Sequence, residues 1–331
     1  MGNRGMVVSA VGDVVLARDD PRSAFDAVLP LLQDSEFRIC NLEVPLSDGG
    51  LPQYGKHETL RSSPAMIEGY VHAGFDAVSL ANNHTMDYGP VALLDTIRLL
   101  DENRIAYAGA GRDRASAWAP LIHDVNDTQI GVVSFASEGF LGYGANSERA
   151  GIAMIRRDPL FGEGSVSSDD VGAMRETIQQ AKRDSEWVLA CFHWGLSQST
   201  SVSVSQSFLA RAAIEAGADA VIGHHPHVLQ GVEIYRGVPI LYSVGNFVFD
   251  LRPSFFGPWT DASVVARLFL EQGRSVGVEL VPIWIGTDGN PRPLSHDDPN
   301  CLRILEALQR MSEALGTRVE ATSGVARVVT A

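Results

Sequence analysis

Short apolar segments of this chain repeatedly end in a polar side chain that can bind a metal ion or transfer a proton. Five such segments are residues 6–12, 37–40, 75–80, 187–191 and 219–222. Amphipathic stretches with the period of a helix lie between them, for example residues 91–103 and 204–217. Short buried strands that alternate with helices are typical of α/β folds. Functional groups of such folds gather at the carboxyl ends of the strands, so we expect one site there.

The polar residues that follow these segments are the candidate site residues. They are Asp13, Glu43, Asn83 with His84, His193, and His225 with His227. Carboxylate, amide and imidazole groups are common metal ligands. Each residue alone is also compatible with a turn or a surface loop, but five strand ends of this kind favour a shared site. On an extended chain, His225 and His227 would direct both rings to the same side, because side chains alternate.

Two histidines are candidates for acid–base catalysis. His84 and Asp87 are close enough to pair, and a carboxylate that orients an imidazole is a common general acid–base unit. His296, which Asp297 follows, is the second candidate, with a surface loop as the alternative. The polar segment 47–63, which contains Lys56, either approaches an anionic group of the substrate or forms a solvated loop.

Charge and cysteine usage limit the partners and the compartment. The formal net charge of the 331 residues is −14, which argues against nucleic acid or an anionic membrane as the main partner. The three cysteines stand singly, which favours a reducing compartment without disulfides. We find neither a signal peptide nor a run of about 18 apolar residues, so we expect a cytoplasmic protein.

The distribution of the predicted elements favours a single domain that covers residues 1–331. Strands and helices alternate in the first two-thirds of the chain, whereas the last third is rich in hairpins. We expect the C-terminal hairpin and helix, at about residues 262–316, to pack on this domain. A helix is also expected at residues 21–33, and no regular element after residue 315.

Longer motifs of the chain resemble those of a known family. The motifs are GDVVLARD, NLEVPL, SLANNHTMDYG, GAGRD, FHWG, GHHPHVLQGVE and YSVGNFVFD. They look like the CapA branch, the poly-γ-glutamate capsule biosynthesis family, of the calcineurin-like metallophosphoesterase superfamily. The resemblance implies a calcineurin-like α/β sandwich with two mixed β-sheets flanked by α-helices. It also implies that Asp13, Glu43, Asn83, His193, His225 and His227 are the metal ligands.

Three departures from the superfamily pattern limit the expected metal content. Val15 stands where an Asp-x-His motif would place a histidine, and Glu43 stands where the second aspartate is usual. Leu196, Ser197 and Gln198 follow the HWG motif, where many members carry an acid. We therefore expect one divalent ion rather than a dinuclear centre. Mn, Ca and Zn are not distinguished by these ligands, and no organic cofactor is expected.

The absence of an anchor makes the chain similar to the peptide-modifying members of this family, which include epimerases of lasso-peptide biosynthesis. The resemblance implies a metal-dependent epimerase that inverts the Cα of the C-terminal residue of a ribosomal precursor peptide. The substrate partner would then be the C-terminal segment of that peptide. Its catalytic groups would be Asp13, His84, Asp87 and His296.

Two other functions remain open. The same site would suit hydrolysis of a phosphoester, with His84 as the proton donor to the leaving group. Alternatively, the chain is a non-catalytic component of poly-γ-glutamate biosynthesis with a structural metal. Trp194, Trp259, Phe255 and Phe256 are candidates for an apolar pocket that accepts a peptide side chain, or else they are ordinary core and surface residues.

Overall fold

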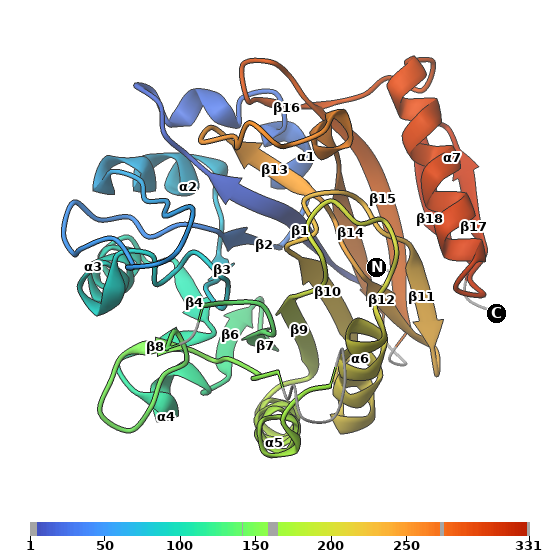
Figure 1. The fold of residues 1–331 in the computed structure, drawn as a ribbon. Helices are drawn as coiled ribbons and strands as arrows, with labels where there is room; N and C mark the ends of the chain where they lie inside the picture. Colours follow the sequence, from blue (N-terminus) through green and yellow to red (C-terminus); the bar gives the residue numbers. More distant parts are fainter. Residues whose placement is uncertain (1–4, 141, 158–164, 272–274, 330–331) are drawn as a thin grey trace.

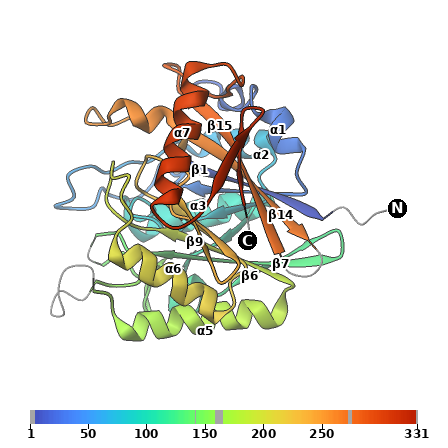
Figure 2. The same cartoon turned by 90° about the vertical axis from the view of Figure 1, so that its right-hand side faces the viewer.

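Two β-sheets pack face to face in this computed structural model, and helices cover their outer faces (Figure 1). The structure describes residues 5–140, 142–157, 165–271 and 275–329. Figure 2 shows the same layers from the side, with α5 (Ser168–Asp184) and α6 (Val204–Ala216) together below the second sheet. This arrangement confirms the predicted α/β sandwich of two mixed sheets flanked by helices.

The first sheet is mixed and is built around β1 (Met6–Val15). Its order is β17 (Val319–Thr322), β18 (Val325–Val328), β15 (Ser275–Ile285), β14 (Ala262–Glu271), β1, β2 (Phe37–Leu42), β3 (Ala77–Ser79) and β4 (Ala106–Ala108). In addition, β13 (Asn246–Phe249) pairs with β1 and β16 (Pro291–Pro293) pairs with β15. Because β1 runs parallel to both β2 and β13, the carboxyl ends of these three strands meet at one edge.

The second sheet brings another set of parallel strand ends to the same region. Its order is β11 (Val232–Tyr235), β12 (Val238–Leu241), β10 (Ala220–His224), β9 (Trp187–His193), β7 (Thr128–Ala136) and β6 (Leu121–Val125). Strands β7, β9, β10 and β12 are parallel. A separate two-stranded sheet pairs β5 (Ala110–Gly111) with β8 (Gly151–Ile152).

Three apolar clusters hold these layers together. The central cluster lies between the sheets and includes Val8 and Ile39 from the first and Leu189 and Ile222 from the second. A second cluster joins the first sheet to α1 (Leu29–Gln33), α2 (Ile67–Ala73) and α3 (Gly89–Glu102). The third cluster joins the second sheet to α4 (Arg114–Ala117), α5 and α6. Burial on both faces explains why the central strands read as nearly continuous apolar runs.

The structure differs from the sequence prediction in three elements. The helix expected at residues 21–33 is divided into a 3₁₀ turn (Arg22–Ala24) and the short α1, whose start is set by Pro30 because proline fits only the first helical turn. The segment after α7 (Pro299–Glu313) forms the hairpin β17–β18. The C-terminal hairpin β14–β15 is part of the first sheet, because β14 pairs directly with β1. No described helix is long and apolar enough to cross a membrane.

Candidate metal centre

Two buried carboxylates stand side by side at the carboxyl ends of β1 and β2. Asp13 lies in β1, and Glu43 directly follows β2. The side-chain amide of Asn41 bridges them, because its Nδ2 donates to Asp13 Oδ1 at 2.8 Å and also to an oxygen of Glu43. The register of β1 shifts at Asp13 against its two parallel neighbours, β2 and β13. Such an irregularity re-aims a side chain at the end of a strand.

A glycine before Asp13 allows the chain to take this path. A Cβ atom on Gly12 would lie 2.0 Å from the carbonyl oxygen of Gly245, which is closer than any two such atoms can approach. Gly12 therefore lets β1 approach the turn before β13, and this contact places Asp13 opposite Asn246. Gly12 is therefore required by the close approach of the two backbones, and Asp13 is the candidate ligand that this approach positions.

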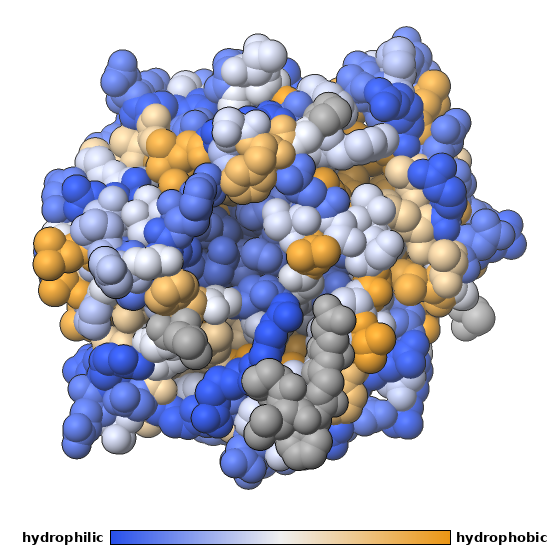
Figure 3. Space-filling view, viewed as in Figure 1, coloured by the Kyte–Doolittle hydropathy of each residue, from blue (hydrophilic) through white to orange (hydrophobic). Residues whose placement is uncertain are grey.

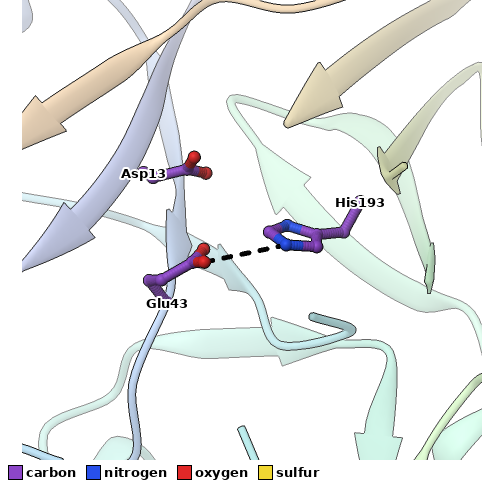
Figure 4. A group of neighbouring side chains, drawn as sticks. All are labelled: Asp13, Glu43 and His193. Atoms are coloured by element: carbon purple, nitrogen blue, oxygen red, sulfur yellow. Dashed lines mark ion pairs between the residues drawn. The ribbon is translucent and has the colours of Figure 1, made fainter. Parts of the chain in front are cut away.

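His193 approaches the two carboxylates from the opposite sheet, at the end of β9. Figure 4 shows Asp13, Glu43 and His193 with their polar atoms turned toward one another. One ligand atom of each lies within 4.8 Å of the other two. His193 Nε2 is 3.7 Å from Glu43 Oε1 and 2.6 Å from Asn83 Oδ1. Four side chains from four separate segments thus meet at one point.

His225 and His227 join the same cluster, but not from an extended strand as predicted. Both lie just after β10 with positive φ, at 92° and 59°, which is rare for residues other than glycine. His225 Nδ1 is 3.1 Å from His193 Nε2. His227 Nδ1 is 3.3 Å from Asp13 Oδ2 and donates to Asn246 Oδ1 at 2.9 Å. Strained backbone of this kind persists mainly at functional sites.

The donor atoms of this cluster fit a divalent cation. Asp13 Oδ2, Glu43 Oε1 and His193 Nδ1 are buried, and none has a hydrogen-bond partner among the described residues. Burial raises the pKa of Glu43 well above its usual range, and the nearby charge of Asp13 raises it further. A bound cation would relieve the repulsion between the two carboxylates and satisfy their free oxygens. Asp13, Glu43 and His193 therefore form a candidate metal site, which Asn83, His225 and His227 surround.

A carboxylate–imidazole pair stands beside the metal candidates. His84 Nδ1 is 2.6 Å from Asp87 Oδ2, and Asp87 is fully buried. Asp87 also accepts from the Tyr143 hydroxyl at 2.8 Å, from the Leu60 backbone N–H at 2.7 Å, and from the Lys56 ammonium. Burial raises the pKa of Asp87, but the hydrogen bond and charge of His84 outweigh it and lower that pKa below its usual value. An ionised Asp87 holds the His84 Nδ1–H and leaves Nε2 available.

His84 and the residues that surround the candidate metal site line one cleft with a volume of about 320 Å³. Its lining includes Asn83, His84, His225 and His227 on the polar side, and Phe249, Phe255 and Phe256 on the apolar side. Figure 3 shows a recessed hydrophilic area near the middle of this face of the molecule. Lys56 is the single Lys or Arg among the described lining residues, and its ammonium is paired with Asp87.

Three residues predicted as a catalytic group or as part of an apolar pocket do not line this cleft: His296, Trp194 and Trp259. Trp259 is exposed, with the guanidinium of Arg303 5.1 Å from the centre of its ring. His296 is exposed, in the turn between β16 and α7, where its backbone contacts Gly324 of the β17–β18 hairpin. Trp194 is fully buried, stacks on Phe192 at 4.5 Å and donates its indole N–H to the Tyr242 carbonyl. Trp194 is therefore a core residue, and the position of His296 lends no support to its predicted catalytic role.

Several residues with contacts in the site were not recognised in the sequence. Asn41 and Asn246 hold the metal candidates, and Tyr143 holds Asp87. Asn41 could have been found, because it lies two residues before Glu43 and so shares its side of the strand. Lys56, in the segment 47–63, is half-buried and donates to the Asn83 carbonyl oxygen, so this part of the segment is not a solvated loop. Asn246 lies in the motif YSVGNFVFD, which points to the family but not to a role in the site, and no local pattern marks Tyr143.

The fold and the site together define an α/β sandwich protein with a candidate metal centre at the strand ends. Residues 7–251 match the family described as bacterial capsule synthesis protein PGA_cap, and the chain belongs to this family.

Curated relatives of the chain carry capsule-related names. The chain is 29% identical over 307 residues to the capsule biosynthesis protein CapA of Bacillus anthracis, covering 88% of this chain and 70% of the relative. It is 28% identical over 316 residues to the PGA biosynthesis protein CapA of Bacillus subtilis, covering 92% and 78%. It is also 28% identical over 312 residues to a Mycobacterium tuberculosis protein named "Probable polyglutamine synthesis accessory protein", covering 91% and 79%.

Proposed function

We propose that this chain is a metal-dependent enzyme that epimerises the Cα of the C-terminal residue of a ribosomal, lasso-type precursor peptide. The observation that supports acid–base catalysis is the His84–Asp87 pair, because His84 lines one cleft together with Asn83, His225 and His227, which surround the candidate metal site. Removing a Cα proton next to a carboxylate requires a positioned base and a positive charge near the developing anion. The cleft holds candidates for both.

Each group has a distinct task in this proposal. Asp87 keeps His84 in the tautomer whose free Nε2 accepts the Cα proton on one face of the substrate. The proton that completes the inversion has to reach the opposite face, and solvent in the open cleft supplies it. Asp13, Glu43 and His193 would hold a divalent ion, with Asn83 and the two later histidines beside them. When bound, that ion supplies the positive charge that stabilises the substrate anion. The aromatic wall of Phe249, Phe255 and Phe256 excludes water from one side of the cleft.

The lining of the cleft favours a peptide over a phosphoester. Phosphate sites usually offer arginine or free lysine, whereas the single cation described here, Lys56, is already paired with Asp87. Val15, at the position of the missing superfamily histidine, is fully buried in an apolar cluster with Val44 and Phe249. That cluster offers no ligand for a second metal ion, which disfavours two-metal phosphoester hydrolysis.

Two observations keep other functions as candidates. Hydrolysis of a phosphoester needs only one proton donor, and the structure brings a single imidazole–carboxylate pair into the described cleft, with His296 outside it. The names of the relatives refer to capsule and polyglutamine synthesis, and one relative is named as a probable accessory protein. A non-catalytic role in assembly of such a polymer is the third candidate.

Exchange of the Cα hydrogen with deuterated solvent distinguishes the three candidate functions. The metal-loaded protein is incubated in deuterated water with precursor peptides that vary in their C-terminal residue. Deuterium at the terminal Cα, together with a D-residue on chiral analysis, supports the epimerase. Phosphate release from p-nitrophenyl phosphate without exchange supports the hydrolase, and neither activity supports the accessory role. His84→Ala should abolish either reaction, whereas His72→Ala, on α2, should not.

A further inference from the structure

A second cavity, with a volume of about 510 Å³, adjoins the metal cleft. Phe249 and Phe256 line both spaces, so the two aromatic rings form a shared wall. Both rings also contact the imidazole of His227, at centroid distances of 5.4 and 4.8 Å. The volume is within the range of ligand sites in proteins. A substrate held at the metal cleft can therefore extend past Phe256 into this space.

Asn246 connects the second cavity to the metal candidates. Its side chain lines the cavity, and its Oδ1 accepts from His227 Nδ1 at 2.9 Å. Its Nδ2 donates to the carbonyl oxygen of Thr260, another lining residue, at 3.1 Å. A group bound in the cavity thus lies one side chain away from His227, which makes the cavity a natural extension of the same site.

The charges of the cavity select against anions. Its lining contains four aspartates, Asp20, Asp250, Asp261 and Asp288, against two arginines, Arg18 and Arg252. Both arginines are paired inside the cavity: Arg18 with Asp250, where Nε lies 2.8 Å from Oδ2, and Arg252 with Asp261. Asp288 is paired with Arg292, which lies outside the lining, so Asp20 is the lining aspartate for which the described residues offer no ion-pair partner. No described lining residue of the cavity offers an unpaired cation to a carboxylate or a phosphate.

We propose that this cavity binds the segment of an extended, neutral or basic peptide that precedes the residue held in the metal cleft, and that it rejects polyanions such as poly-γ-glutamate. The inference rests on the proposed peptide substrate, but binding is measured without turnover. The described lining residues offer no unpaired cation to an anion, and the unpaired carboxylate of Asp20 attracts a basic side chain and repels a glutamate polymer.

Fluorescence anisotropy with three short labelled probes tests the proposal. The probes are a neutral peptide, a lysine-containing peptide of equal length, and a γ-glutamyl oligomer. The tested variant is Asp20→Lys, which reverses the exposed carboxylate that has no ion-pair partner among the described residues. Glu306→Lys, exposed on α7, changes the net charge by the same amount and is the matched control. Thermal melting of all three proteins checks that each is folded.

We expect wild type and Glu306→Lys to bind the neutral and lysine peptides at least tenfold more tightly than the γ-glutamyl oligomer. Asp20→Lys should lose roughly fivefold in affinity for the lysine peptide and gain as much for the oligomer. A wild-type preference for the oligomer, no binding of either peptide, or equal effects of Asp20→Lys and the control would overturn the proposal. Peptide binding without Cα exchange would leave the cavity assignment intact and reject the epimerase.

Discussion

His84 Nδ1 lies 2.6 Å from Oδ2 of the fully buried Asp87. Asp87 is held in turn by donors from two distant segments, the Lys56 ammonium and the Tyr143 hydroxyl. This network fixes the orientation of the imidazole before any substrate arrives. Pre-organisation of this kind is what distinguishes a catalytic histidine from one that merely lies near a cleft.

Substitution of Asp87 tests the role of this pair. Asp87→Asn keeps the shape of the side chain but no longer selects the tautomer of His84, so we expect turnover to fall by about 10²- to 10⁴-fold. The metal content should stay unchanged, because Asp87 is not among the ligand candidates. Tyr143→Phe removes one donor and should cause a smaller loss. Steady-state kinetics and elemental analysis provide the two readouts, and wild-type turnover in Asp87→Asn would contradict the assignment.

The positive φ of His225 predicts an unusual order of stability between two variants. Glycine normally destabilises a protein relative to alanine, but at φ 92° alanine is strained and glycine is not. We therefore expect metal-free His225→Gly to be about 1 kcal/mol more stable than metal-free His225→Ala in urea unfolding. Both variants should bind the metal less tightly than wild type. If the alanine variant were the more stable of the two, the backbone at His225 would not be strained.

The buried histidines predict a loss of stability in acid. Burial lowers the pKa of His193 well below 6.5 and lowers the pKa of His225 to about 3. In both cases the charges of neighbouring histidines are the second cause and act in the same direction. Burial also lowers the pKa of His224. The unfolded chain therefore binds protons below about pH 6.5 that the folded chain does not, and stability falls as the pH falls. Each such proton contributes a slope of up to about 1.4 kcal/mol per pH unit.

The contribution of Glu43 to the pH dependence of stability has to be removed from this measurement. Its pKa is raised by burial, so its contribution to stability is present at low pH and lost as the pH rises, which opposes the trend of the histidines. Metal-free Glu43→Gln isolates the histidines. We expect its free energy of unfolding, measured in urea, to decrease steadily between pH 7.5 and pH 5. A constant or increasing value over that window would show that the histidines are not buried in their neutral form.

Much of the site was predictable because each ligand candidate directly follows an apolar run. Asp13, Glu43 and His193 stand at strand ends, and parallel strands of two facing sheets bring such ends together. His225 and His227 lie beside the metal candidates, but on backbone with positive φ and not on the predicted extended chain. Pro226 and the turn after β10 replace the extended chain that the alternation rule assumed.

The contacts that the sequence did not predict are made by loops. Lys56 and Tyr143 reach Asp87 from segments 31 and 56 residues away, and no local periodicity reports such a contact. His296 is the opposite case: the acids beside it in the sequence suggested a site, but its side chain is exposed and does not line the cleft. The turn that holds it follows the short strand β16 and lies against the C-terminal hairpin.

The central claim is that Asp13, Glu43 and His193 bind one divalent cation. Elemental analysis of the purified wild-type protein and of Glu43→Gln, after equal exposure to Mn, Ca and Zn followed by desalting, tests it most directly. Exposed Glu306→Gln is the control for loss of a carboxylate. We predict about one equivalent of a divalent metal in wild type and in the control, and at least tenfold less in Glu43→Gln. A metal-free wild type, or equal metal in all three proteins, would contradict the account.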